Sequence, residues 1–223
     1  FILSAKVTKL ANEVDGISVA YKVDGEERKM FANKVMISVG RRPSMDLLGL
    51  DVLNLNVDRR GTIIVDEHLE TSCKGIYACG DINGRSMLAH TAVREAEVAV
   101  ANIIGRQDKM NYDAIPSVVY TNPEVSCVGK SEEELVRDGV EYKTFKLPMS
   151  YSGRFVAENE GLNGMCKVLT DNDDKIIGVH ILGNSSSEFI IAANIAIEQG
   201  MHLEDLKRFV FPHPTVSEIL REF

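Results

Sequence analysis

The chain has 223 residues, a formal net charge of −8 at pH 7 and 44% hydrophobic residues. This length allows one large domain or two small ones, each with a real hydrophobic core. The acidic balance argues against a nucleic-acid partner, because surfaces that bind nucleic acid are basic. No apolar run approaches the length of a membrane span, so we expect no membrane association. No secretory signal with a basic start and an apolar core is present either.

The first forty residues predict a β-meander. Residues 17–23 alternate between apolar and polar or small side chains, which is typical of a half-buried strand. Asp15-Gly16 and Asp24-Gly25 are turn dipeptides of the kind that joins hairpin strands. Residues 34–39 are more continuously apolar and run into Gly40, so we expect a fourth strand there, in a buried sheet.

Residues 44–70 are rich in loop-forming side chains, with a short predicted strand at 62–66. A second short apolar strand ends at Gly80-Asp81. Helical spacing of apolar residues then predicts a helix from Met87 to Ile104, with Gly105 just beyond its end. The charged, turn-like segment 106–115 indicates a domain boundary.

The pattern of the second half predicts five strands and two prominent helices. The strands are expected at 117–120, 126–128, 141–147, 164–170 and 176–182. One helix should follow Ser131, whose acidic successors suit the positive end of the helix dipole. The other should cover 187–199 and end at Gly200; it is apolar enough to be a core or interface helix. The acidic segment 171–174 predicts a hairpin turn and lacks the spacing of a calcium-binding loop.

The four cysteines show no metal-ligand or redox spacing. Their neighbours are apolar or small, so we expect buried free thiols and a reducing, cytoplasmic setting. With no histidine and cysteine cluster nearby, no metal site is expected. The residues are Cys73, Cys79, Cys127 and Cys166.

The segment with the clearest chemical content lies near the end of the chain. His213 stands between two prolines, which restrict the backbone around its ring, and Glu218 follows five residues later. Thr215 or Ser217 can cap a short helix that carries the glutamate. A carboxylate within reach of a fixed imidazole is an arrangement used in general acid–base catalysis. A turn with a surface histidine is the alternative interpretation.

Three further segments could contact a nucleotide. Asp81 follows Gly80 at a strand end, where open α/β sheets bind ligands and a carboxylate can accept bonds from sugar hydroxyls. The residues from Met87 to His90 open the next helix, whose free backbone N–H groups suit an anion or an electron-rich ring. Gly40 and the arginines after it could approach phosphates. A simple turn, an ordinary amphipathic helix and an exposed turn are the respective alternatives.

Taken together and in order, these segments resemble the C-terminal half of dihydrolipoamide dehydrogenases, which are flavoprotein disulfide reductases. The resemblance covers essentially the whole chain. The matching segments are Ser38-Val39-Gly40-Arg41-Arg42-Pro43, Ile76-Tyr77-Ala78-Cys79-Gly80-Asp81, Met87-Leu88-Ala89-His90, Tyr120-Thr121-Asn122-Pro123-Glu124-Val125 and His213-Pro214-Thr215-Val216-Ser217-Glu218. The third and fourth favour lipoamide enzymes over their glutathione-reducing relatives.

The resemblance implies a fold and a set of roles. The fold would be α/β plus α+β, with parts of the NAD- and FAD-binding domains in residues 1–111 and an antiparallel dimerisation domain in 112–223. Asp81 and the backbone of Met87, Leu88, Ala89 and His90 would contact FAD, and Gly40 would approach NAD. His213 would be the acid–base catalyst, supported by Glu218, and would serve the other subunit of a homodimer. The implied partner is a lipoyl-bearing protein of a 2-oxoacid dehydrogenase or glycine cleavage complex. The peptide before Pro214 is expected to be cis.

The chain also departs from the family pattern. It contains no G-x-G-x-x-G fingerprint and no C-x-x-x-x-C redox pair, and it begins inside what should be the NAD-binding domain. We therefore expect these 223 residues alone to be inactive and to bind FAD weakly or not at all. The alternatives are a non-catalytic dimerisation module and a piece of another disulfide reductase, such as glutathione reductase.

Overall fold

The computed structural model describes residues 1–45 and 49–223. The chain forms two compact units, Phe1–Arg42 and Pro43–Phe223. Residues 46–48, which belong to the segment predicted to be loop-rich, lie outside the described residues.

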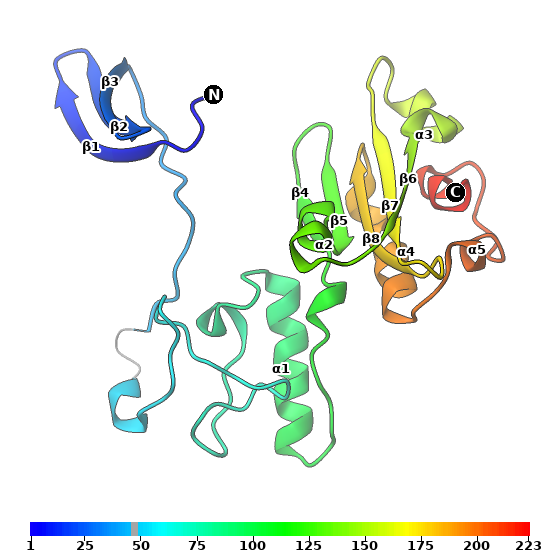
Figure 1. Ribbon diagram of the computed structural model, residues 1–223, viewed down its shortest axis with the longest axis horizontal. Coiled ribbons are helices and arrows are strands. Elements are labelled where there is room, and N and C mark those ends of the chain that lie inside the picture. The colour runs from blue at the N-terminus through cyan, green and yellow to red at the C-terminus, as the bar shows by residue number, and fades with distance from the viewer. Residues whose placement is uncertain (46–48) are drawn as a thin grey trace. The chain divides into compact units, whose positions relative to one another are not determined.

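The first unit contains the predicted β-meander (Figure 1). Its antiparallel strands, in the order β1-β2-β3, are β1 (Lys6–Glu13), β2 (Gly16–Val23) and β3 (Glu26–Ala32). Asp24 and Gly25 join β2 to β3 with φ values of 52° and 84°. Two left-handed residues in succession are what a two-residue hairpin turn with native strand twist requires, which explains the Asp-Gly pair.

The prediction of a strand at residues 34–39 is wrong. These residues form no regular structure, and Met36 and Ile37 are 91% and 65% exposed. A strand needs a neighbour to pair its backbone N–H and C=O groups, and none of the described residues pairs with this segment. Residues 34–39 therefore have the apolar pattern of a buried strand but do not form one.

The second unit begins with a small core around helix α1 (Ala89–Ile103). The 3-10 helices η1 (Leu50–Leu53) and η2 (Gly80–Asn83) precede it. Its buried apolar residues are Ile63, Val65, Leu69, Ala78, Val98 and Ala99. The strands predicted at 62–66 and before Gly80 appear only as isolated bridges, which join Val57 to Ile63, Val65 to Thr71 and Glu70 to Tyr77. Helix α1 starts two residues later than predicted, and Gly105 follows it with a φ of 79°, as expected for a C-terminal glycine.

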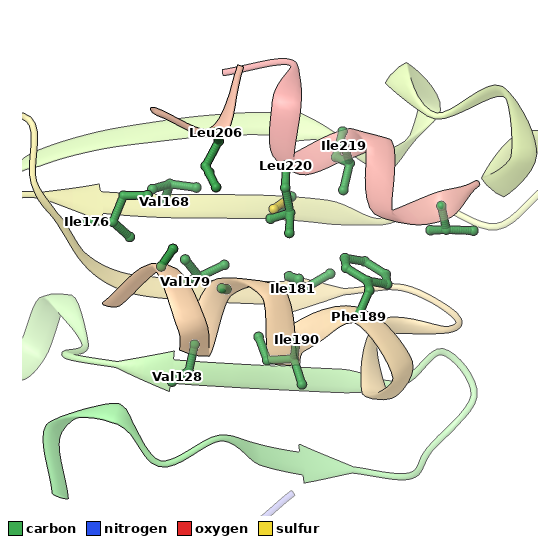
Figure 2. Close-up of a cluster of buried hydrophobic side chains, with 14 of the residues drawn as sticks. Val128, Val168, Ile176, Val179, Ile181, Phe189, Ile190, Leu206, Ile219 and Leu220 are labelled. Atoms are coloured by element: carbon green, nitrogen blue, oxygen red, sulfur yellow. The ribbon is translucent and has the colours of Figure 1, made fainter. Parts of the chain in front are cut away.

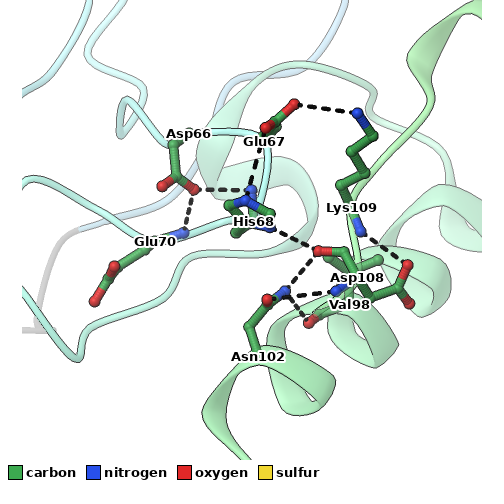
Figure 3. A network of polar contacts seen from close by, with 8 residues as sticks. All are labelled: Asp66, Glu67, His68, Glu70, Val98, Asn102, Asp108 and Lys109. Atoms are coloured by element: carbon green, nitrogen blue, oxygen red, sulfur yellow. Dashed lines mark hydrogen bonds and ion pairs between the residues drawn. The ribbon is translucent and has the colours of Figure 1, made fainter. Parts of the chain in front are cut away.

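A polar network holds the 66–70 turn against the end of α1 (Figure 3). The carboxylate of Asp66 accepts the backbone N–H of His68 at 2.9 Å. The imidazole Nδ1 of His68 donates to the carbonyl oxygen of Asp108 at 2.7 Å, and Asn102 Nδ2 donates to the same oxygen at 2.8 Å. Hydrogen bonds thus join segments about forty residues apart where few strand pairs exist.

The rest of the second unit is built on a five-stranded antiparallel sheet in the order β4-β5-β8-β7-β6 (Figure 1). All five predicted strands are confirmed, and their ends agree with the predicted ones to within two residues. They are β4 (Ser117–Val119), β5 (Val125–Gly129), β6 (Lys143–Pro148), β7 (Met165–Thr170) and β8 (Ile176–Leu182). The segment 171–174 forms the predicted hairpin turn between β7 and β8.

Both predicted helices of this half are confirmed. Helix α2 (Glu132–Asp138) begins with a capping box in which Ser131 and Glu134 each bond the other's backbone N–H. Helix α4 (Ser186–Glu198) packs on β5 and β8. The shorter elements are η3 (Tyr112–Ala114), η4 (Met149–Tyr151), α3 (Gly153–Glu158), α5 (Leu203–Leu206) and η5 (Val216–Arg221).

One face of this sheet carries the main core (Figure 2). Val179 and Ile181 of β8 are two residues apart and therefore point to the same face. There they meet Phe189 and Ile190 of α4 and the apolar side of η5, including Ile219. Each of these side chains is almost completely removed from water, so burial of apolar surface fixes the position of η5 and of the loop before it.

The expectation of four buried thiols is only partly correct. All four cysteines are free, but only Cys166 is buried; Cys73 and Cys127 are half-buried and Cys79 is exposed. Burial raises the pKa of the Cys166 thiol to about 12. Cys79 is exposed because it lies at the end of its short apolar segment, immediately before the turn at Gly80.

Candidate functional site

His213 and Glu218 form a contact at the C-terminal end of the chain. The imidazole Nδ1 lies 3.0 Å from the Oε1 atom of Glu218. The His213 side chain is 82% exposed, whereas that of Glu218 is 25% exposed. The pair therefore has an anchored carboxylate and an imidazole whose other nitrogen, Nε2, faces outward from this contact.

The loop around the pair is held by local bonds and by the core beneath it. Glu218 Oε2 accepts the backbone N–H of Thr215 at 2.8 Å, and the Thr215 hydroxyl donates to the carbonyl oxygen of Pro212 at 2.8 Å. The His213–Pro214 peptide is cis, as expected. Val216 and Ile219 bury the inner side of η5 in the main core. The predicted short helix carrying Glu218 is confirmed.

The Glu218 carboxyl is held in its ionised form. The backbone N–H of Thr215, and then the His213 side chain, lower its pKa below the usual value. An ionised acceptor at Nδ1 favours the tautomer with its proton on that atom, which leaves Nε2 free to accept a proton. The arrangement can therefore act as a general base, and, once protonated, as a general acid.

A second group of predicted residues lies on η2 and at the start of α1. Gly80 is buried with a φ of 79°, and Asp81 is partly exposed in the first turn of η2. Met87 and Leu88 precede α1 and are half-buried, while Ala89 is exposed in its first turn. The residue before the helix, Leu88, makes no side-chain bond to the first turn of α1.

His90 is exposed, and its ring bonds a backbone carbonyl oxygen. Its Nε2 atom lies 2.8 Å from the carbonyl oxygen of Pro116, so the ring joins the start of α1 to the segment before β4.

Gly40 is an exposed glycine with a left-handed backbone. It belongs to the first unit, has a φ of 91°, is exposed, and would meet nothing within 4 Å if it carried a Cβ atom. The structure thus brings His213 to Glu218, and η2, which carries Asp81, to α1.

Sequence reasoning missed one residue beside Asp81. Glu95 of α1 is completely buried, and its carboxyl oxygens bond the η2 segment and Tyr112. A signal was present, because Thr91, Glu95, Val98 and Ala99 follow helical spacing and all four are buried. A glutamate in the apolar stripe of a helix indicates a buried polar network. No group of three or more potential metal ligands occurs in the described part of the chain, and no helix among those residues is long and apolar enough to cross a membrane.

Comparison with known proteins places this fold. The structure of LpdA from Mycobacterium tuberculosis aligns with 98% of this chain, over 47% of LpdA, with a TM-score of 0.87 and 23% identity. The HOCl-induced flavoprotein disulfide reductase RclA from Escherichia coli aligns with 100% of this chain, over 51% of RclA, with a TM-score of 0.83 and 24% identity. At this identity the likeness establishes the fold, which is that of the flavoprotein disulfide reductases.

Sequence comparison identifies the family. The pyridine nucleotide-disulphide oxidoreductase model matches residues 1–96, and the dimerisation-domain model of the same group matches residues 115–223. The chain therefore belongs to the pyridine nucleotide-disulphide oxidoreductases. Our boundary at residue 111 falls between the two matches and stays a prediction.

Several curated relatives are similar over the entire chain. The mitochondrial dihydrolipoyl dehydrogenases of Caenorhabditis elegans and Homo sapiens are 39% and 38% identical to it, and the dihydrolipoyl dehydrogenase of Cupriavidus necator is 37% identical. The chain spans 45%, 44% and 47% of these relatives, or about half of their length.

Proposed function

We propose that this chain is the C-terminal half of a dihydrolipoamide dehydrogenase, whose full-length parent oxidises dihydrolipoamide to lipoamide with NAD through FAD and a redox disulfide. The observation that carries the proposal is the 3.0 Å contact between His213 and Glu218. The 37–39% identity to dihydrolipoyl dehydrogenases supports this choice of substrate. Another disulfide reductase activity is the second candidate, favoured by the fold likeness to RclA.

In the proposed reaction His213 handles the proton of a thiol. Glu218 holds the ring through Nδ1, so the lone pair on Nε2 can remove a proton from a dihydrolipoamide thiol. The product is a thiolate, which is the form that attacks a disulfide sulfur. In the reverse direction the imidazolium returns the proton to the leaving thiolate. The high exposure of His213 suits a base that meets a substrate or a second subunit.

The residues near η2 fit the flavin end of FAD. Asp81 supplies a carboxylate for ribityl hydroxyls, and the uncapped start of α1 supplies N–H groups for the electron-rich edge of a ring. When bound, FAD supplies an acceptor for the two electrons of the thiols. Met87, Leu88, Ala89 and His90 would offer backbone contacts, and Gly40 would lie at the NAD site of the parent.

We further propose a homodimer in which residues 112–223 form the interface. Ile191 and Ile195 of α4 are half-exposed apolar side chains one turn apart, which is typical of a helix that packs against a partner. His213 would then serve the disulfide and the flavin of the other subunit. We also propose that the partner of the parent protein is a lipoyl-bearing protein and that the parent is located in the cytoplasm.

The substitution His213→Gln in the full-length parent tests the proposed role. Loss of the base should lower thiol–disulfide turnover by about 10²–10⁴-fold, the usual contribution of a general base. Flavin content should not change, because His213 lies in the loop before η5 whereas Asp81 lies on η2. Unchanged turnover would exclude His213 as the base. Turnover of glutathione disulfide in preference to lipoamide would select the second candidate.

A further inference from the structure

The strongest unassigned feature is the buried carboxyl group of Glu95. Three donors converge on it: the backbone N–H of Gly80 at 2.5 Å and Asn83 Nδ2 at 2.9 Å, both on Oε2, and the Tyr112 hydroxyl at 2.6 Å on Oε1. Glu95 is completely buried. A buried carboxyl group is costly unless its oxygens are bonded, so this geometry depends on all three donors.

Two of the donors belong to the segment that carries Asp81. Gly80 and Asn83 are the first and last residues of η2, and Asp81 lies between them. Asn83 also donates to the carbonyl oxygen of Ala78 at 3.4 Å. A single atom of Glu95 thus holds both ends of the turn from which the Asp81 side chain projects.

The third donor connects this turn to the second half of the chain. Tyr112 opens η3, immediately before β4, and the guanidinium of Arg85 lies 5.1 Å from the centre of its ring. Burial, followed by the Glu95 carboxyl, raises the pKa of the Tyr112 hydroxyl above its usual value, so this group remains a donor. The bond therefore joins the turn to the segment that leads into the dimerisation domain.

We infer that Glu95 is a positioning residue, which fixes the Gly80–Asn83 turn and thereby sets Asp81 for the ribityl hydroxyls of a flavin. Asp81 makes the contact; Glu95 acts through the backbone of Gly80 and the side chain of Asn83. The inference rests on the proposed function for its ligand, and on the three bonds for its geometry.

The reach of the side chain, and not its charge alone, is the property that matters. In Glu95→Gln an amide oxygen can still accept from Gly80 and Asn83, and the amide nitrogen can donate to the Tyr112 oxygen. In Glu95→Asp the side chain is one methylene shorter, so its carboxyl group cannot reach both η2 and Tyr112. The neutral Gln variant should therefore preserve the turn, whereas the charged Asp variant should disturb it.

Amide exchange, measured residue by residue by NMR on the 223-residue chain, tests the positioning directly. In Glu95→Asp the protection of the Gly80 amide should fall by about tenfold, while the amides of Val98 and Ala99 in the middle of α1 change by less than about twofold. Glu95→Gln should keep the Gly80 amide protected. The control Glu97→Asp, an exposed position on the same helix, should change nothing. An equal rise in exchange along α1, or a Gln variant as unprotected as the Asp variant, would overturn the inference.

Flavin affinity in the full-length parent separates this inference from the proposed function. Glu95→Asp should raise the Kd for FAD by about tenfold, which corresponds to one lost hydrogen bond of about 1.4 kcal/mol. Glu95→Gln should stay within about threefold of the wild-type value. If Asp81→Asn leaves the Kd unchanged, the assigned flavin site is wrong, whereas the exchange experiment still decides whether Glu95 holds the turn. An unchanged Kd in Glu95→Asp beside a weakened Asp81→Asn would overturn the positioning role alone.

Discussion

Residues 34–39 and residues 176–182 have similar apolar sequences and opposite fates. The second segment is β8, paired on both sides by β5 and β7 and buried against α4. The first segment has no paired neighbour among the described residues, and its Met36, Ile37 and Val39 side chains are exposed. The difference teaches that an apolar run forms a strand only where another strand satisfies its backbone.

The largest expected difference concerns one isoleucine from each of these segments. Ile181→Ala removes a side chain from the main core and should lower the free energy of unfolding by about 2–5 kcal/mol. Ile37→Ala removes an exposed side chain and should change it by less than about 0.5 kcal/mol. Urea denaturation of both variants measures this. Equal effects would mean that residues 34–39 are packed as well as β8 is.

Helix capping should give the next largest effect. Ser131→Ala breaks the capping box of α2 and should lower stability by about 1 kcal/mol. Its matched control is Glu133→Gln, an exposed position in the same turn, with an expected change below about 0.5 kcal/mol. Thermal unfolding of the two variants compares them. A control as harmful as Ser131→Ala would show that the charge of the first turn, and not the cap, stabilises α2.

The smallest effect concerns a turn in the less regular region. The backbone N–H of Thr62, followed by the Arg60 side chain, lowers the pKa of Asp58 to about 2. Because the folded pKa lies below the ordinary value of 3.8, the stabilisation is present above about pH 4 and is lost as the pH falls toward 2. An NMR titration of the Asp58 carboxyl group should give a midpoint near 2, and a midpoint near 3.8 would mean that the turn is open in solution.

The sequence predicted the second half better than the first. The apolar run at 176–182, the Ser131 cap and Gly200 after the end of α4 are local signals that agree with the final packing. The 34–39 and 62–66 segments carry the same local signal, but whether they become strands depends on neighbours that the local pattern does not reveal. Glu95 was missed because its partners, Gly80 and Tyr112, come together only in the folded chain.

The candidate site shows the same contrast. His213 and Glu218 are five residues apart, so the contact between them could be predicted from the prolines and the short helix alone. Asp81 and the start of α1 could be placed side by side from their order in the chain. Gly40 belongs to the first unit, and the local pattern did not predict the division of the chain after Arg42.

The flavin content of the purified 223-residue chain tests the central claim most directly. The claim is that this chain contributes an acid–base pair and one end of a flavin site to a parent about twice its length. It predicts little or no flavin absorbance after incubation with FAD and gel filtration, and no dihydrolipoamide-dependent reduction of NAD. A yellow preparation with one FAD per chain would contradict it, because the flavin site would then be complete without the rest of the parent.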